Sequence, residues 1–214
     1  MRRLVALIIL ALAATACSAN ADGPELGYIA GEGQQVIEVA RREQAPAVSG
    51  ETLDGEPLAL GDCPGKPVVL SFWASWCGPC ATEAPQIQAV SGAYAGRVCV
   101  VGVDVQDRVA NAKTFERDLG ITYPSLFDPS ARIAAQFRGI APQALPTTLV
   151  LDAQHRVAVR HFGAVTADEL RGYLDRVLGE EGAQRPPVGG DLAGEEGARR
   201  PPVGGDLLVG GDLA

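Results

Sequence analysis

The stretch Phe72-Trp73-Ala74-Ser75-Trp76-Cys77-Gly78-Pro79-Cys80 decides the fold of this chain. It follows an apolar run, Val68–Leu70, and precedes a segment with helical character, so a strand should deliver two cysteines to the first turn of a helix. The free N–H groups and the positive dipole there favour the thiolate of Cys77, the species that attacks a disulfide. Pro79 is tolerated because first-turn N–H groups lack helical partners. The pattern predicts a redox-active Cys77–Cys80 disulfide.

Two other interpretations of this C-x-x-C pair are half of a zinc site and an inert structural disulfide. A zinc site needs two more ligands, yet the sequence has no second C-x-x-C pair, and His155 and His161 are isolated. The sequence therefore predicts no metal site, and the sequence Trp76-Cys77-Gly78-Pro79-Cys80 after a buried-type strand favours redox chemistry.

Composition sets the class of molecule. The 214 residues carry a formal charge of −8 and are 47% hydrophobic, which suits one globular domain with tails. The acidic balance argues against nucleic acid as a partner.

The N-terminus has the pattern of an export signal. Arg2 and Arg3 precede eleven apolar residues, Leu4–Ala14, which are too few to cross a bilayer. Cys17 follows small residues, as in a bacterial lipoprotein signal, so residues 1–17 are predicted to be such a signal ending at a lipidated Cys17. An ordinary signal cleaved at Ala16 or within 19–21 is the alternative. Both place the domain outside the cytoplasm, where a disulfide persists.

The order of elements predicts an α/β sandwich with a mixed sheet. Residues 18–43 lack periodicity and are interpreted as a linker, and residues 44–178 as the domain. We expect a hairpin around Thr52–Leu58, strands at 68–73, 98–103, 145–152 and 156–162, and helices at 80–94, 110–119, 129–137 and 166–178. The last helix opens on a capping box, Thr166-Ala167-Asp168-Glu169.

The C-terminal residues 179–214 differ in composition from the domain. A segment rich in Gly, Pro and charge starts at Gly179 and recurs at Gly194. Two such repeats are too few and too polar to pack as a solenoid, so a disordered tail without its own activity is expected.

Residues 44–178 resemble the thioredoxin superfamily, specifically the TlpA/ResA-like thiol-disulfide oxidoreductases exported by bacteria. The resemblance rests on spaced anchors: Gly65-Lys66-Pro67, the 72–80 stretch, Glu83, Pro85, Gly120-Ile121-Thr122-Tyr123-Pro124 and Leu145-Pro146-Thr147-Thr148. It implies a thioredoxin-like sandwich, a central mixed sheet flanked by helices, with an N-terminal hairpin and an inserted helical segment after the second core strand.

The resemblance also implies residue roles. Cys77 is the attacking thiol, and Cys80 the resolving one. Pro146 matches a cis-proline whose loop packs against the disulfide and pairs with substrate backbone. We expect substrate contacts from Leu145 and Pro146 and from the exposed part of the motif, Trp76, Gly78 and Pro79. An ordinary proline at a strand start is the alternative for Pro146.

Glu83 is the candidate proton acceptor. Thioredoxins bury an aspartate where this chain has Ser71, and a serine cannot take the proton from Cys80. In the ResA-like pattern Glu83 replaces it, and its i,i+3 spacing from Cys80 places both on one helix face. Partial burial there would raise its pKa. The alternative is a surface glutamate near the helix start.

Cys63 and Cys99 are the remaining cysteines. Parallel strands at 68–73 and 98–103 would bring the loop carrying Cys63 near Cys99. A bridge closing this loop of about 37 residues would stabilise the fold by roughly 4 kcal/mol if chain entropy alone counted. Two separate buried thiols are the alternative.

The function expected from the resemblance is that of a monomeric thiol-disulfide reductase, lipid-anchored at the outer face of the cytoplasmic membrane. Its substrate would be the heme-binding cysteine pair of an apocytochrome c, and its electron donor a CcdA/DsbD-like membrane protein. No metal, flavin or nucleotide is called for. A DsbA-like thiol oxidase and a non-catalytic thiol chaperone remain alternatives, whereas the P-x-x-x-T-x-x-C pattern of peroxiredoxins is absent.

Overall fold

A six-stranded mixed sheet forms the centre of the computed structural model, which describes residues 33–137 and 144–184. The strand order is β1-β8-β7-β4-β5-β6. β4, β5 and β6 run parallel, whereas β7, β8 and β1 continue the sheet in antiparallel pairs. The predicted α/β fold class is confirmed. The strands are β1 (Gly33–Val36), β4 (Val68–Trp73), β5 (Cys99–Val105), β6 (Ser125–Asp128), β7 (Thr147–Leu151) and β8 (Val157–Phe162).

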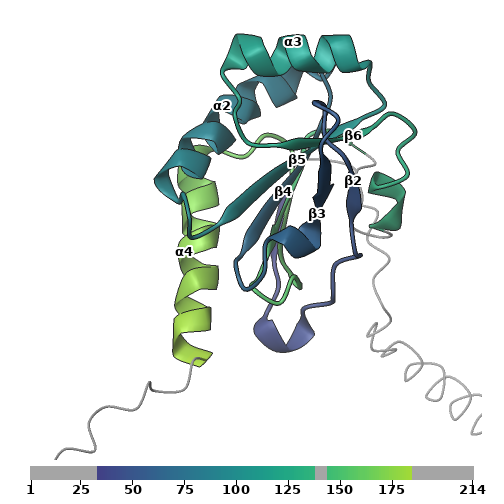
Figure 1. Cartoon of the computed structure of the whole chain (residues 1–214). Coiled ribbons are helices and arrows are strands. Elements are labelled where there is room, and N and C mark those ends of the chain that lie inside the picture. The colour runs from purple at the N-terminus through teal and green to yellow at the C-terminus, as the bar shows by residue number, and fades with distance from the viewer. Residues whose placement is uncertain (1–32, 138–143, 185–214) are drawn as a thin grey trace, which may run out of the picture.

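Helices and a hairpin cover the sheet (Figure 1). Helices α2 (Gly78–Ala93) and α4 (Ala167–Gln184) lie side by side on one face, and α3 (Val109–Leu119) crosses one end. The predicted hairpin is β2 (Ser49–Glu51) with β3 (Pro57–Ala59), and short 3-10 turns occupy Val39–Arg41, Leu60–Asp62 and Ala134–Gln136.

Alternation along β4 divides the core in two. Val68, Leu70 and Phe72 point into the cluster on the hairpin side, while Val69 packs under α2 and α4. Successive strand side chains point to opposite faces, so Ser71 and Trp73 share the α2 side. The central strand is buried along its whole length, as its apolar sequence predicts.

The domain is longer at both ends than the predicted range 44–178. Gly33–Val36, interpreted as linker, forms an edge strand on β8, and the Arg42 side chain is buried against Asp152. The last helix continues past Leu178 to Gln184 because Glu180 binds Arg42 and Arg176. The predicted signal at residues 1–17 and the tail beyond 184 lie outside the described residues.

Two internal predictions also differ from the structure. The segment 129–137 is not a continuous α-helix, because Ala131 has a positive φ of 55°, which an α-helix does not accommodate. The Asp128 carboxylate accepts N–H bonds from Arg132, Ile133 and Ala134, and only the short 3-10 turn Ala134–Gln136 follows. The helix predicted after the second core strand is present as α3, but the chain after it also forms a strand that was not predicted, β6, which is only four residues long. Among the described residues, no helix is long and apolar enough to cross a membrane.

Candidate active site

Cys77 and Cys80 lie at the junction between β4 and α2. Cys77 is the N-cap of the helix, its Sγ accepts the Cys80 N–H at 3.3 Å, and the two sulfurs form a disulfide. Both residues are buried, at 6% and 1% exposure, although their neighbours Gly78 and Pro79 are exposed and Trp76 is 61% exposed. The disulfide therefore lies just beneath a surface that a protein substrate can reach.

The turn after β5 fixes the loop that carries Cys77. The Asp107 carboxylate accepts the Ser75 N–H at 2.6 Å, and the carbonyl of Gln106 accepts the indole N–H of Trp76 at 3.0 Å. Gln106 has a φ of 54°, a left-handed conformation uncommon for a residue other than glycine. No sequence pattern pointed to this turn as part of the site.

The loop before β7 approaches the disulfide from another side. The Leu145–Pro146 peptide bond is cis, as the resemblance implied, and Pro146 is buried. Leu145 packs against the cluster that contains Cys77 and Cys80, and the Pro146 carbonyl accepts the Gly163 N–H. The structure thus brings Leu145 and Pro146 to the same site as the cysteines.

Glu83 is buried one turn beyond Cys80, at 1% exposure, and not on the surface. Its Oε1 accepts bonds from the Thr148 hydroxyl at 3.0 Å and the Val165 N–H at 3.1 Å, and its Oε2 faces the Ser71 hydroxyl at 3.4 Å. Thr148 and Val165 were missed by sequence reasoning. The two threonines that open an otherwise apolar strand, directly after Pro146, were the available signal for Thr148.

Strand register explains why Glu83 finds hydroxyl donors. Ser71 pairs with Thr148 on one side and with Gly102 on the other, and Gly102 pairs with Ser125. These residues form one row across four strands. Because register partners point to the same face, small and polar groups line the space under α2 where Glu83 lies.

Burial dominates the titration of Glu83. Desolvation raises its pKa from 4.5 to about 7, even though the bonds from Val165, Thr148 and Ser71 favour the carboxylate. A carboxyl that titrates near neutral pH can both accept and return a proton, which suits an acid–base role near a thiol.

Cys63 and Cys99 are bonded to each other. Cys63, after the 3-10 turn Leu60–Asp62, forms a disulfide with Cys99 at the start of β5, and Val68 pairs with Cys99 across the parallel ladder. This bridge ties the hairpin side of the domain to the sheet.

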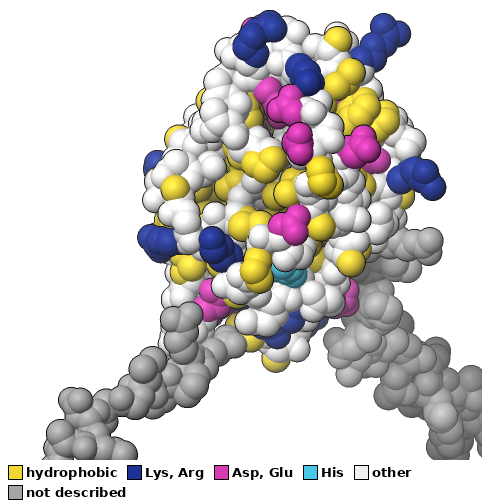
Figure 2. Space-filling model, viewed as in Figure 1, with side chains coloured by type: hydrophobic (Ala, Val, Ile, Leu, Met, Phe, Trp, Pro, Cys, Tyr) yellow, Lys and Arg dark blue, Asp and Glu magenta, His cyan; other side chains and the backbone are white. Residues whose placement is uncertain are grey.

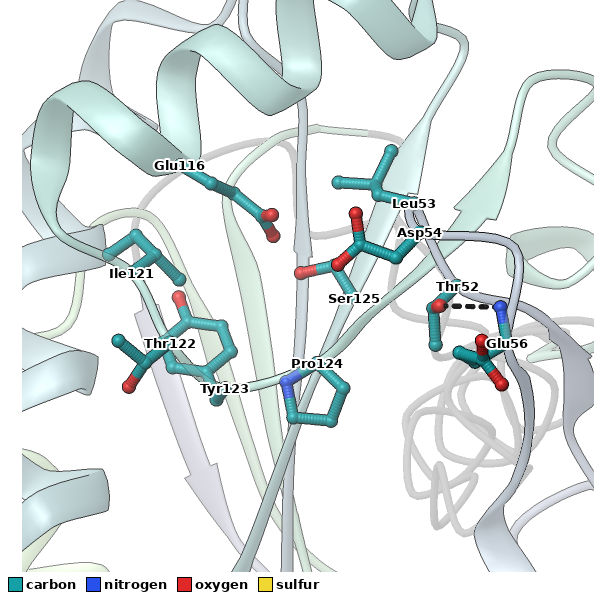
Figure 3. A pocket seen from close by; sticks show the side chains of 10 residues that line it. All are labelled: Thr52, Leu53, Asp54, Glu56, Glu116, Ile121, Thr122, Tyr123, Pro124 and Ser125. Atoms are coloured by element: carbon teal, nitrogen blue, oxygen red, sulfur yellow. Dashed lines mark hydrogen bonds between the residues drawn. The ribbon is translucent and has the colours of Figure 1, made fainter.

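A pocket of about 350 Å³ opens near the hairpin turn and the end of α3, and contains none of the cysteines. In Figure 3, Glu116 and Asp54 extend toward Ser125 in its interior. Figure 2 shows acidic and hydrophobic side chains mixed on this side of the molecule, with Lys and Arg toward its margins. Of the residues that line the pocket, Leu53 also packs in the cluster that contains Cys77 and Cys80. Its lining residues are Thr52, Leu53, Asp54, Glu56, Glu116, Ile121, Thr122, Tyr123, Pro124 and Ser125.

The mixed sheet, the disulfide at the start of α2 and the cis-proline loop define a thioredoxin-like protein. The comparisons with known proteins agree. The profile of the AhpC/TSA family matches residues 42–160, and the chain belongs to that family.

Its relatives are named as thioredoxin-like or thiol-disulfide proteins. The thioredoxin-like protein YneN of Bacillus subtilis is 33% identical over 142 residues, which are 65% of this chain and 81% of YneN. The thiol-disulfide oxidoreductase ResA of Bacillus thuringiensis is 29% identical over 136 residues, 63% of this chain and 77% of ResA. The structure of a secreted thiol-disulfide isomerase from Corynebacterium glutamicum matches with a TM-score of 0.67 and 31% identity, covering 72% and 96% of the two chains. The chain is a ResA-type thiol-disulfide oxidoreductase.

Proposed function

We propose that this protein is an extracytoplasmic reductase of protein disulfides, working by dithiol exchange through Cys77 and Cys80. The observation that carries the proposal is the disulfide at the N-terminus of α2, flanked by the exposed Trp76 and by the Pro146 loop. In the reduced protein, the helix N-terminus favours the Cys77 thiolate.

The exchange takes two steps. The Cys77 thiolate attacks one sulfur of the substrate disulfide, forming a mixed disulfide and releasing the first substrate thiolate. The Cys80 thiol then gives its proton to Glu83, directly or through one water, and its thiolate attacks the Cys77 sulfur. The second substrate thiolate leaves and the Cys77–Cys80 disulfide forms. Two electrons have passed to the substrate, and an external dithiol must restore them.

Trp76, Gly78, Pro79, Leu145 and Pro146 are the proposed substrate contacts, since they surround the disulfide. The proposed substrate is the cysteine pair of an apocytochrome c, and the proposed donor is a CcdA/DsbD-like membrane dithiol. The relatives named thiol-disulfide oxidoreductase ResA support protein disulfides as the substrate class.

Cys80→Ala tests the chemistry. Without the resolving thiol the mixed disulfide persists, so cells should yield covalent adducts through Cys77 that a reductant releases. The matched control is Cys77→Ala/Cys80→Ala, which should yield none. A folded Cys80→Ala protein with a free Cys77 and no adducts would contradict the mechanism.

The redox state of the pair in cells tests the direction. Thiol trapping should find Cys77 and Cys80 mostly reduced, and oxidised when the membrane donor is deleted. A pair that stays oxidised with the donor present would instead support a thiol oxidase.

We further propose that Cys17 is lipidated and holds the domain at the outer face of the cytoplasmic membrane. The secreted relative supports a place outside the cytoplasm. Cys17→Ser should release a folded domain from the membrane fraction, because several acyl chains on one cysteine bind firmly and their loss leaves no anchor. Equal membrane retention of the variant would refute the lipid anchor.

A further inference from the structure

The turn that follows β5 holds the loop that carries Cys77 through the carboxyl group of Asp107, and a second carboxyl group lies next to it. Asp107 accepts N–H bonds from Ser75 and Arg108, each at 2.6 Å. Although burial opposes its ionisation, these bonds lower the pKa of Asp107, so it is the carboxylate of the pair.

The neighbour is Asp104, which is fully buried at the end of β5. It pairs in register with Trp73 on β4 and Phe127 on β6, both of which pack in the cluster with Cys77 and Cys80. Treated as a carboxylate, Asp104 finds no donor for either oxygen. Its side chain nevertheless lies within hydrogen-bond reach of Asp107.

The missing donors and the closeness to Asp107 are compatible only if Asp104 is protonated. Two carboxylates cannot hydrogen-bond to each other, and a fully buried anion without a donor is costly. When Asp104 carries a proton, its O–H satisfies both conditions by donating to the Asp107 carboxylate.

We propose that Asp104 is a positioning residue: as a neutral acid it donates to Asp107, which in turn holds the Ser75 N–H and so fixes the loop that presents Cys77. The inference rests on the proposed role of the Cys77–Cys80 pair, but the hydrogen-bond chain itself does not require a substrate.

The surroundings of Asp104 predict when the chain of bonds breaks. The charges acting on it come from Asp107 in its own turn, Glu116 on α3 and Asp128 at the end of β6, whereas β4 contributes the uncharged Trp73. Desolvation and then Asp107 raise the pKa of Asp104 to about 8. Above that pH the donor is lost, and two like charges face each other beneath the loop.

The test follows the Ser75 amide resonance of the full chain by NMR from pH 6 to 10. The oxidised protein is used because its disulfide cysteines do not titrate, and Glu83→Gln serves as background because Glu83 titrates near 7. We expect the chemical shift of the Ser75 amide to change in a step near pH 8. Above this step, the amide should exchange with solvent faster than the ordinary increase of exchange with pH predicts. Asp104→Asn, whose amide still donates, should keep the low-pH resonance position and abolish the step.

Glu116→Gln is the matched control, because Glu116 is a half-buried carboxyl whose charge also acts on Asp104, and the step should survive that change. In the reduced protein, Asp104→Leu should slow disulfide exchange about tenfold, as loss of loop positioning predicts, while Asp104→Asn restores it. If Asp104→Leu does not fold, Asp104→Asn alone decides the question. A Ser75 resonance that does not change with pH, or a step that survives in Asp104→Asn, would overturn the proposal. Failure to reduce substrates would leave the NMR result intact and refute the proposed function alone.

Discussion

Glu83 shows how one residue acquires its chemistry from three elements. It comes from α2, its donors Ser71 and Thr148 come from neighbouring strands, and Val165 precedes α4. Three donors favour the carboxylate and burial opposes it, and burial is the larger effect. The result is a carboxyl poised to exchange a proton near neutral pH.

Glu83→Gln should remove that titration while keeping the shape and two of the acceptor bonds. In the resolving step the carboxylate takes a proton, so the wild-type exchange rate should rise through about pH 7, and the variant should lack this rise. The loss at pH 8 should approach 100-fold, a typical size for proton-transfer assistance. Disulfide-exchange rates measured against pH in both proteins make the comparison, and superimposable profiles would assign the proton transfer elsewhere.

The same change has a consequence for stability. A carboxyl whose pKa is raised by folding stabilises the fold below its unfolded pKa, and this contribution disappears as pH rises through the folded pKa. Between pH 4.5 and about pH 7, the free energy of unfolding of the wild type should fall by about 3 kcal/mol relative to that of Glu83→Gln. Denaturant unfolding of the two oxidised proteins measures this difference. The exposed Glu51→Gln is the control and should show no such difference.

At the scale of single residues, the sequence predicted the identity of the acid–base residue, Glu83, but not the residues that surround it. The spacing from Cys80 was enough to select Glu83, and the cysteine motif was enough to place Cys77 at a helix start. The partners Thr148 and Val165 and the carboxyl pair Asp104–Asp107 come from separate elements. Their meeting depends on register and packing, which no local pattern encodes.

At the scale of elements, Gly102 shows how tightly β5 packs under α2. A Cβ at this position would lie 2.2 Å from the Ser125 Oγ and 2.8 Å from the Trp73 indole nitrogen. Both of these neighbours are buried in the sheet, so they have little room to move.

Gly102→Ala should therefore destabilise the domain by about 1–3 kcal/mol, the usual cost of overpacking a core. Gly50→Ala in β2 is the matched strand control, because its Cβ would meet its nearest neighbour, the Ile133 side chain, at an ordinary 3.4 Å. Thermal unfolding of both variants and the wild type measures the difference. An equal melting temperature for the two variants would mean that Ser125 and Trp73 move aside freely.

The elements that were predicted correctly are those with strong local signals. β4 is a continuous apolar run, α3 ends at Gly120 in the left-handed conformation, and α4 opens on a Thr166–Glu169 capping box. The misassigned segment 129–137 looked helical in composition, but the left-handed conformation of Ala131 interrupts it, and only a 3-10 turn at Ala134–Gln136 follows. Short edge strands such as β1 and β6 are set by the partner strand rather than by their own sequence.

At the scale of the whole molecule, the two ends of the domain are held together by charge. The buried Arg42 pairs with Asp152 and Glu180, and Asp152 also binds Arg156. Arg42 further donates to the Ile37 carbonyl, so the N-terminal segment, the β7–β8 turn and the end of α4 share one network. The residues on either side of the predicted range 44–178 are thus structural.

Two truncated chains test this conclusion. A chain that starts at Gly33 should melt as the full chain does, whereas one that starts at Gln44 loses β1 and Arg42. The free energy of unfolding of the second chain should be lower by about 3 kcal/mol. This is the lower end of the usual cost of removing one partner of a buried ion pair, because Asp152 retains its other partner, Arg156. Arg42→Met in the longer chain keeps β1 and separates the ion pair from the strand. Equal unfolding midpoints for the two truncated chains would show that residues 33–43 add nothing to the fold, and that the domain begins where the sequence pattern placed it.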